Sequence, residues 1–152
     1  MVPRLDAQLM DARDPKTMQS LRGGVEEAGF LIVENTRLSQ EDVRNVIKAY
    51  RTFFHLPEAQ KQAVNMALTG ANRGWGASGS EQVDPNANPD YKQVFDCGFE
   101  LDPQDPLRSE NLSVYGENLW PEDMPEFKAV VQTYYAQALD VSMRVLRAIA
   151  SA

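Results

Sequence analysis

Arg73 is the residue whose chemistry best suits the binding of a small organic acid. It opens the glycine-rich piece Arg73-Gly74-Trp75. A guanidinium in such a piece could form paired hydrogen bonds to a substrate carboxylate, because its N–H donors match the two carboxylate oxygens. The alternative is an exposed loop arginine, which these residues alone favour. Arg73 is therefore a candidate substrate-binding residue with a simpler alternative beside it.

The chain holds one histidine, His55, and one cysteine, Cys97. Sites that need two or more histidines, such as His-x-Asp…His iron sites and HExxH zinc sites, cannot be built from these residues, and neither can thiolate zinc clusters. We expect no metal ligand, no catalytic residue and no cofactor-binding residue in the chain. His55 follows a helical stretch and favours a structural or solvent-facing role, and Cys97 is predicted to be a buried, unreactive thiol in an apolar strand.

Two further patterns have simpler explanations than ligand binding. Gly74-Trp75-Gly76-Ala77-Ser78-Gly79 fits GxGxxG, but a phosphate site needs a buried strand before it and a helix after it. Here a polar stretch precedes the pattern and Asp84-Pro85 interrupts the residues after it, so glycine punctuation of a loop is favoured over nucleotide binding. Arg37-Leu38-Ser39 is an Arg-x-Ser pair of the kind that can bind a carboxylate, yet Ser39 is better explained as a helix N-cap.

The elements that must position these residues follow from apolar spacing. Residues 2–6 favour a short edge strand, and Asp14-Pro15 predicts the start of a helix that ends at Gly29. Residues 30–33 predict a buried strand. Residues 39–42 have the form of a capping box, and the helix that they open is stopped by Pro57. Its apolar stripe consists of Val43, Val46, Ile47, Tyr50 and Phe54.

The second half of the chain is irregular until its last helix. Residues 69–89 predict a loop with one short extended piece at 73–75, and residues 93–99 predict a strand. A long helix is expected from Pro121 or Pro125 to the end of the chain. Because this helix carries core residues to the last positions, an interrupted domain and a natural C-terminal helix are both open. Its predicted apolar face consists of Phe127, Val130, Val131, Tyr134, Ala138, Val141, Val145 and Ile149.

Length and charge limit the class of protein. The 152 residues suit a single domain over 1–152. A net charge of −7 argues against nonspecific nucleic-acid binding, which depends on Lys and Arg. No apolar run approaches the length of a membrane span, and the first residues lack the apolar segment of a secretory signal. We therefore expect a soluble, cytoplasmic protein that binds neither nucleic acid nor membranes.

Seven short motifs follow one another along the chain. They are Val2-Pro3-Arg4-Leu5-Asp6, Gly29-Phe30 with Val33 and Asn35, Phe53-Phe54-His55-Leu56-Pro57 with Lys61, Arg73-Gly74-Trp75 with Glu81, Asp90-Tyr91-Lys92-Gln93, Phe95-Asp96-x-Gly98, and Asn118-Leu119-Trp120-Pro121 with Pro125 and Phe127. Their order resembles the isopenicillin N synthase-like family of Fe(II)/2-oxoglutarate-dependent dioxygenases, in which the distance of Glu81 from the Arg-Gly-Trp piece is also familiar. The resemblance runs from residue 2 to about 150 and covers the N-terminal region of that family.

The resemblance implies an α+β, helix-rich N-terminal domain. Its few short strands would extend the major sheet of a double-stranded β-helix barrel, and a long C-terminal helix would follow. Departures from the family pattern are Thr36 and Arg37 in place of His-Gly, and Gln93 in place of an acidic residue, which puts a local salt bridge there in doubt.

The resemblance also implies a function. The parent enzyme would use Fe(II) and 2-oxoglutarate to oxidise a small molecule. The barrel region, which would be the partner of this chain, would hold both cofactors, and this chain would hold neither. The chain alone is expected to be inactive and to self-associate. Arg73 would bind a substrate carboxylate at the entrance of the site. The alternative is a metal-free interaction subunit, or a split partner of a separate barrel chain.

Overall fold

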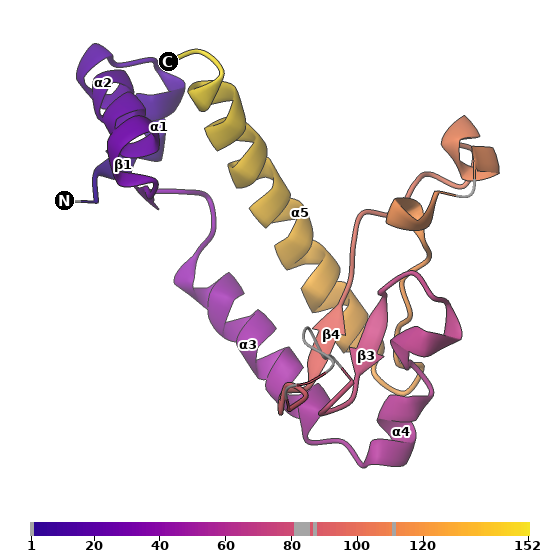
Figure 1. Ribbon diagram of the computed structural model, residues 1–152. Coiled ribbons are helices and arrows are strands. Elements are labelled where there is room, and N and C mark those ends of the chain that lie inside the picture. The colour runs from indigo at the N-terminus through magenta and orange to yellow at the C-terminus, as the bar shows by residue number, and fades with distance from the viewer. Residues whose placement is uncertain (1, 81–85, 87, 111) are drawn as a thin grey trace. The chain divides into compact units, whose positions relative to one another are not determined.

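The computed structural model describes residues 2–80, 86, 88–110 and 112–152, which divide into two compact units. The first unit comprises Met1–Ile47 and Val130–Ala152, and the second comprises Lys48–Ala129. Helices α3 (Gln40–Phe54) and α5 (Pro125–Ile149) contribute residues to both (Figure 1). Within the described residues, no helix has the length and apolarity needed to cross a bilayer. The chain is helix-rich with four short strands among these residues and a long C-terminal helix, as expected for the predicted class.

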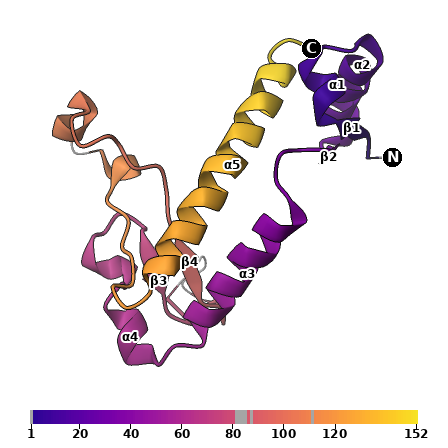
Figure 2. The same ribbon diagram turned by 180° about the vertical axis from the view of Figure 1, so that it is seen from behind.

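The first unit is built on a two-stranded parallel sheet. Strand β1 (Arg4–Asp6) pairs with β2 (Ile32–Glu34), and helices α1 (Ala7–Asp11) and α2 (Pro15–Gly23) lie between them in the chain. Figures 1 and 2 show α1 and α2 beside the C-terminal end of α5. The core of the unit consists of Leu5, Met10, Leu21 and Ala148.

Helix starts in this unit follow the predicted capping residues. The Asp14 carboxylate accepts a hydrogen bond from the Thr17 amide at 2.9 Å, which confirms the start of α2. The Ser39 hydroxyl accepts from the Asp42 amide at 3.0 Å, and the Asp42 carboxylate accepts from the Ser39 amide at 3.0 Å. This reciprocal pair is the predicted capping box. Gly29 ends the helical stretch with φ of 69°, as predicted.

The prediction of a buried strand over residues 30–33 is wrong. Strand β2 starts at Ile32, and the side chains of Phe30 and Ile32 are 71% and 38% exposed. In the described part of the chain, β2 pairs only with β1, along three residue pairs. A fully apolar run is typical of a strand covered on both faces, and this small sheet does not provide that cover.

The second unit holds an antiparallel pair of strands and several short helices. Strand β3 (Gly74–Gly76) pairs with β4 (Val94–Asp96), which places Trp75 opposite Phe95. The predicted strand over 93–99 is therefore limited to its first half, and the extended piece predicted at 73–75 begins one residue later. Helix α4 (Glu58–Gln62) and the 3-10 helices Met66–Leu68, Pro106–Glu110 and Ser113–Tyr115 complete the unit.

Aromatic rings form the core of the second unit. Phe53 has no exposed surface, and its ring centroid lies 4.8 Å from that of Phe95 and 5.1 Å from that of Phe127. Tyr50 and Trp120 contact the Phe127 ring from other directions. Such ring pairs add to the burial of apolar area, so this cluster joins α3, β4 and the start of α5.

Helix α5 confirms the predicted apolar face. Each of the eight positions predicted for that face is buried or half-buried. Leu139, Met143 and Leu146 lie outside it and are exposed. The helix therefore has a second apolar stripe that the described residues do not cover.

Candidate functional site

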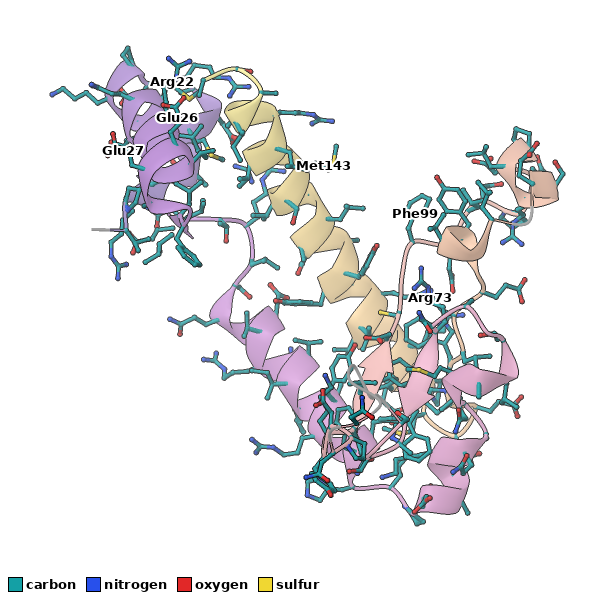
Figure 3. All side chains as sticks on the ribbon, in the orientation of Figure 1. Arg22, Glu26, Glu27, Arg73, Phe99 and Met143 are labelled. Carbon is teal, nitrogen blue, oxygen red and sulfur yellow. The ribbon has the colours of Figure 1, made fainter. Side chains whose placement is uncertain are left out.

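Arg73 lies at the entrance to strand β3, in the second unit (Figure 3). Its side chain is half-buried. Nη2 donates a hydrogen bond to the carbonyl of Val114 at 3.0 Å, and Nη1 donates to the carbonyl of Asn72 at 3.4 Å. Nε is enclosed and has no hydrogen-bond partner among the residues that the structure describes. Arg73 is thus held by two backbone carbonyls rather than free at the surface.

Gly98 lies directly against this guanidinium. A Cβ atom at Gly98 would be 2.2 Å from Nη2 and 2.4 Å from Cζ of Arg73, closer than atoms can pack. The peptide groups of Gly98 are held by Asn118, whose Oδ1 accepts from the Gly98 amide and whose Nδ2 donates to the Gly98 carbonyl, both at 2.8 Å. The sequence patterns did not indicate this three-residue arrangement, because 25 residues separate Arg73 from Gly98 and a further 20 separate Gly98 from Asn118.

Cys97 lies beside the same guanidinium. The thiol is half-buried and follows β4, so it lies just outside the strand that was predicted to contain it. Burial raises the pKa of Cys97, and the charge of Arg73 opposes that rise. Burial also raises the pKa of Tyr50, which hydrogen-bonds to Cys97. The prediction of a buried thiol within a strand is therefore wrong in both respects, and the raised pKa of the thiol favours its protonated form.

Two exposed apolar residues adjoin the backbone groups that contact Arg73. Val114, whose carbonyl binds Nη2, is 63% exposed. Phe99 follows β4, is 48% exposed and contacts the ring of Tyr115 edge-on, with centroids 6.5 Å apart. Figure 3 labels Phe99 and Arg73. An exposed apolar side chain is thus carried by Val114, which binds the guanidinium through its carbonyl, and another by the residue that follows Gly98.

A second polar cluster surrounds Lys61, which is only 5% exposed. Its Nζ donates to Oε1 of Gln93 at 2.8 Å and to the carbonyl of Phe54 at 3.2 Å, and it lies 5.3 Å from the centroid of the Trp75 ring. Trp75 Nε1 donates to the same Gln93 oxygen at 3.0 Å. A neutral amide therefore stands where the resemblance expects a carboxylate, and a hydrogen bond replaces the salt bridge.

The GxGxxG pattern makes no phosphate loop. Its residues 74–76 form the buried strand β3, and no helix begins directly after that strand among the residues that the structure describes. The glycines at 74 and 76 are needed for space, because a Cβ would meet the carbonyl of Val64 at 2.3 Å and the side chain of Val94 at 2.7 Å respectively. Glu81 and Asp84-Pro85 lie outside the described residues.

The remaining candidate residues have local roles. His55 is exposed at the end of α3, with Nδ1 2.7 Å from the carbonyl of Arg51. Ser39 is occupied by the capping box with Asp42. In the part of the chain that the structure describes, no three His, Cys, Asp or Glu side chains cluster as a metal site. Arg73 remains the candidate site residue.

Comparison with known proteins connects this architecture to one group of enzymes. The family model described as non-haem dioxygenase in morphine synthesis, N-terminal, matches residues 2–123. A 2-oxoglutarate-dependent dioxygenase of Aspergillus niger is 30% identical over 86% of this chain and 40% of its own length. A homoarginine-6-hydroxylase of Arabidopsis thaliana is 30% identical over 90% of this chain and 40% of its own length.

Solved structures agree in fold. A protein of the 2OG-Fe(II) oxygenase family from Caulobacter crescentus matches 99% of this chain with a TM-score of 0.82 and 25% identity, and the match covers 48% of that protein. A Neurospora crassa protein, solved in complex with alpha-KG and thymine, matches 98% of this chain and 47% of its own, with a TM-score of 0.73 and 26% identity. The chain thus spans about 40% of the length of the two curated relatives and about half of these structures.

Proposed function

Because the chain belongs to the family of non-haem dioxygenase N-terminal regions, we propose that it is the N-terminal part of a 2-oxoglutarate-dependent, Fe(II)-dependent oxygenase that oxidises a small molecule. In this role the chain supports a catalytic barrel and contributes Arg73 to the substrate entrance. Strands β3 and β4 would extend the major sheet of that barrel. The similarity to oxygenases over nearly the whole chain supports the proposal.

The residues of this chain do not fit the two cofactors. One histidine and no cluster of metal-ligating side chains among the described residues are too few for a His-x-Asp…His iron site. The single Arg-x-Ser pair, Arg37 and Ser39, has its hydroxyl occupied by Asp42. Fe(II) and 2-oxoglutarate are therefore assigned to the barrel region, and the contribution of this chain is binding and orientation.

The N–H donors that the Arg73 guanidinium has left are the observation that supports the substrate role. Nε lies against the Gly98 backbone, whereas Nη1 and Nη2 each carry a second N–H beyond the one that they donate to Asn72 and Val114, and a carboxylate could accept from these terminal groups. Val114 and Phe99 would contact the apolar part of such a substrate. The substrate class is therefore a small carboxylic acid. Among the relatives, the enzyme from Arabidopsis thaliana is named for homoarginine, which carries a carboxylate, whereas the Neurospora crassa structure holds thymine, which does not.

Steady-state kinetics of the full-length oxygenase test the role of Arg73. Homoarginine is the first substrate to assay in a panel of small carboxylic acids, with thymine as the comparison that lacks a carboxylate. Arg73→Ala should raise the substrate KM by roughly 10- to 100-fold, since charged hydrogen bonds contribute about 1.5–3 kcal/mol. Arg73→Lys should recover part of this, because an ammonium keeps the charge but loses the planar fork. The KM for 2-oxoglutarate should not change.

Two outcomes would contradict the proposal. If both variants keep the substrate KM of the wild type, Arg73 does not bind substrate. If the KM for 2-oxoglutarate rises equally, the substitution has disturbed the fold rather than a substrate contact. Anaerobic titration of the chain itself with Fe(II) and 2-oxoglutarate provides a separate test of the cofactor assignment, because a charge-transfer band with stoichiometric iron would place the metal site in these residues.

A further inference from the structure

Gly98 leaves no space between its backbone and the Arg73 guanidinium. A Cβ atom there would lie 2.2–2.6 Å from three atoms of that group, namely Nη2, Cζ and Nε. The φ of Gly98 lies outside the left-handed region, so the close approach of the Arg73 side chain, and not the backbone conformation, makes this position sensitive to an added Cβ. The guanidinium thus lies in the space that a side chain at position 98 would take.

Asn118 holds the Gly98 backbone in place through two hydrogen bonds. Its amide side chain both accepts from the Gly98 N–H and donates to the Gly98 C=O, at 2.8 Å each. Among common side chains of this length, only an amide supplies an acceptor and a donor side by side. A rotation of the chain at Gly98 would break both bonds, so Asn118 holds the orientation of the surface against which Arg73 lies.

The Val114 carbonyl also restricts the position of the Arg73 guanidinium. It accepts a hydrogen bond from Nη2 at 3.0 Å, so Arg73 is held by Gly98 on its covered side and by Val114 at one nitrogen. A guanidinium held in this way loses little rotational freedom when it binds a carboxylate. We propose that Gly98 and Asn118 position the Arg73 guanidinium for a carboxylate-bearing substrate. This inference rests on the proposed function of Arg73.

Cys97 provides a direct measurement of the position of the guanidinium. It is the single cysteine of the chain, so alkylation by iodoacetamide reports one site. The groups that act on its ionisation are Tyr50, Arg73, Asp96 and Glu100, and of the charged ones only Arg73 favours the thiolate. If the guanidinium moves away, the pKa of the thiol rises and alkylation at a fixed pH slows.

The experiment is the pH profile of Cys97 alkylation in the 152-residue chain. Asn118→Ala should move the profile to higher pH, in the same direction as Arg73→Ala, with the rate near pH 8 lowered about two- to fivefold. Adding Asn118→Ala to Arg73→Ala should produce no further change, because Asn118 acts through the guanidinium.

Gly98→Ala, the variant that forces the guanidinium away, should likewise move the profile to higher pH and should add nothing to Arg73→Ala. Asn45→Ala, at an exposed position of α3, and Gly23→Ala, where a Cβ meets nothing within 4 Å, are the matched controls and should keep the wild-type profile.

Other outcomes overturn the inference. If Arg73→Ala shifts the pH profile of alkylation but Asn118→Ala and Gly98→Ala keep the wild-type profile, Asn118 and Gly98 do not position the guanidinium. A shift to lower pH in Asn118→Ala would show that the substitution opened the thiol to solvent instead. An unchanged profile in Arg73→Ala would show that the guanidinium does not lie beside Cys97.

Kinetics of the full-length oxygenase separate this inference from the proposed function. Gly98→Ala and Asn118→Ala should each raise the substrate KM at least several-fold and up to the value of Arg73→Ala, with the KM for 2-oxoglutarate unchanged and no further effect in the Arg73→Ala background. If Arg73→Ala raises the KM and neither other variant does, the positioning role is wrong and the role of Arg73 stands. If Arg73→Ala leaves the KM unchanged, the proposed function of Arg73 is wrong, and the positioning inference is overturned with it.

Discussion

The buried ammonium of Lys61 is bound by the side-chain amide of Gln93, with 2.8 Å between Nζ and Oε1. The same oxygen accepts from the indole of Trp75, so the side chain of Gln93, which directly precedes β4, connects α4 to β3. Lys61 is 5% exposed, whereas Gln93 lies at the surface. A cation with little access to water is therefore held by neutral oxygens and the face of an aromatic ring.

Gln93→Glu should stabilise the chain by supplying a carboxylate, because the contacts of Lys61 with the described residues are to neutral groups only. A charged acceptor binds an ammonium more strongly than an amide does, and one of its oxygens can still accept from Trp75. The expected gain is about 1 kcal/mol, or roughly 2–4 °C in Tm for a chain of this size. Gln93→Ala should instead destabilise by about 1–3 kcal/mol, because Lys61 and Trp75 both lose an acceptor.

Differential scanning calorimetry of these variants provides the measurement. Gln19→Glu, at an exposed position of α2, is the control for the added negative charge and should leave Tm nearly unchanged. A Tm for Gln93→Glu at or below that of Gln19→Glu would contradict the explanation, because the buried ammonium would then gain nothing from a carboxylate.

Asp11 should make the stability of the first unit depend on pH in the acid range. The hydrogen bonds from Arg144 are the main reason that the pKa of Asp11 lies below its usual value, and Nε of Arg144 is 3.0 Å from Oδ2. A carboxyl group with a lowered folded-state pKa stabilises the fold above its unfolded-state value of about 3.9, and this contribution is lost as the pH falls through the folded-state value. Asp11→Asn should therefore lower the free energy of unfolding at pH 7 by up to about 1 kcal/mol, since Asp11 is 43% exposed and solvent screens the pair.

Urea unfolding at pH 7 and at pH 2–3 tests this dependence. The difference between Asp11→Asn and the wild type should be largest at pH 7 and small at pH 2–3. Glu27→Gln removes a carboxylate from an exposed position of the same unit and should cause no comparable loss (Figure 3). An Asp11→Asn deficit of equal size at both pH values would mean that packing, rather than charge, causes the loss.

Local features of the fold were predictable because neighbouring residues determine them. The Asp14 cap, the Ser39–Asp42 capping box and the turn at Gly29 each depend on residues a few positions apart. The apolar face of α5 was predictable for a similar reason, since helical periodicity places its residues together. Predicting these features did not require the identity of the residues that pack against them.

Features that depend on distant partners could not be predicted in the same way. Residues 30–33 have the composition of a buried strand, but their burial depends on how many neighbouring strands cover them, and the first unit provides β1 alone among its described residues. Arg73 was identified from its residue type and position. Its contact with Gly98, and the hydrogen bonds of Asn118 to Gly98, follow from the pairing of β3 with β4 and the return of the chain to that sheet before α5. No local pattern contains that information.

Phe53 should be among the residues on which the second unit depends most. Its ring has no exposed surface and packs against Phe95 and Phe127. Phe53→Ala should lower the free energy of unfolding by about 3–5 kcal/mol, because it removes a buried ring and leaves a cavity in a packed cluster. Phe30→Ala makes the same change where the ring is 71% exposed and should cost less than about 1 kcal/mol. Urea unfolding of the two variants provides the comparison, and equal losses would show that the aromatic cluster is not the core of this unit.

The exposed stripe of α5 should cause the isolated chain to self-associate. Leu139, Met143 and Leu146 follow one another at helical spacing and are 39%, 40% and 57% exposed. Met143 is labelled on α5 in Figure 3. An apolar stripe of this kind is typical of a surface that another part of a protein covers, and the proposed barrel region is the expected cover.

Met143→Glu should weaken self-association at least tenfold, since burying a side chain of this size contributes about 1.5–3 kcal/mol and 1.4 kcal/mol is a factor of ten. Ser142→Glu places the same charge beside the stripe and should weaken it much less. Sedimentation velocity over a range of concentrations measures the association, and co-expression with the barrel region should suppress it. A wild-type chain that stays monomeric and binds no apolar dye would show that this surface needs no partner.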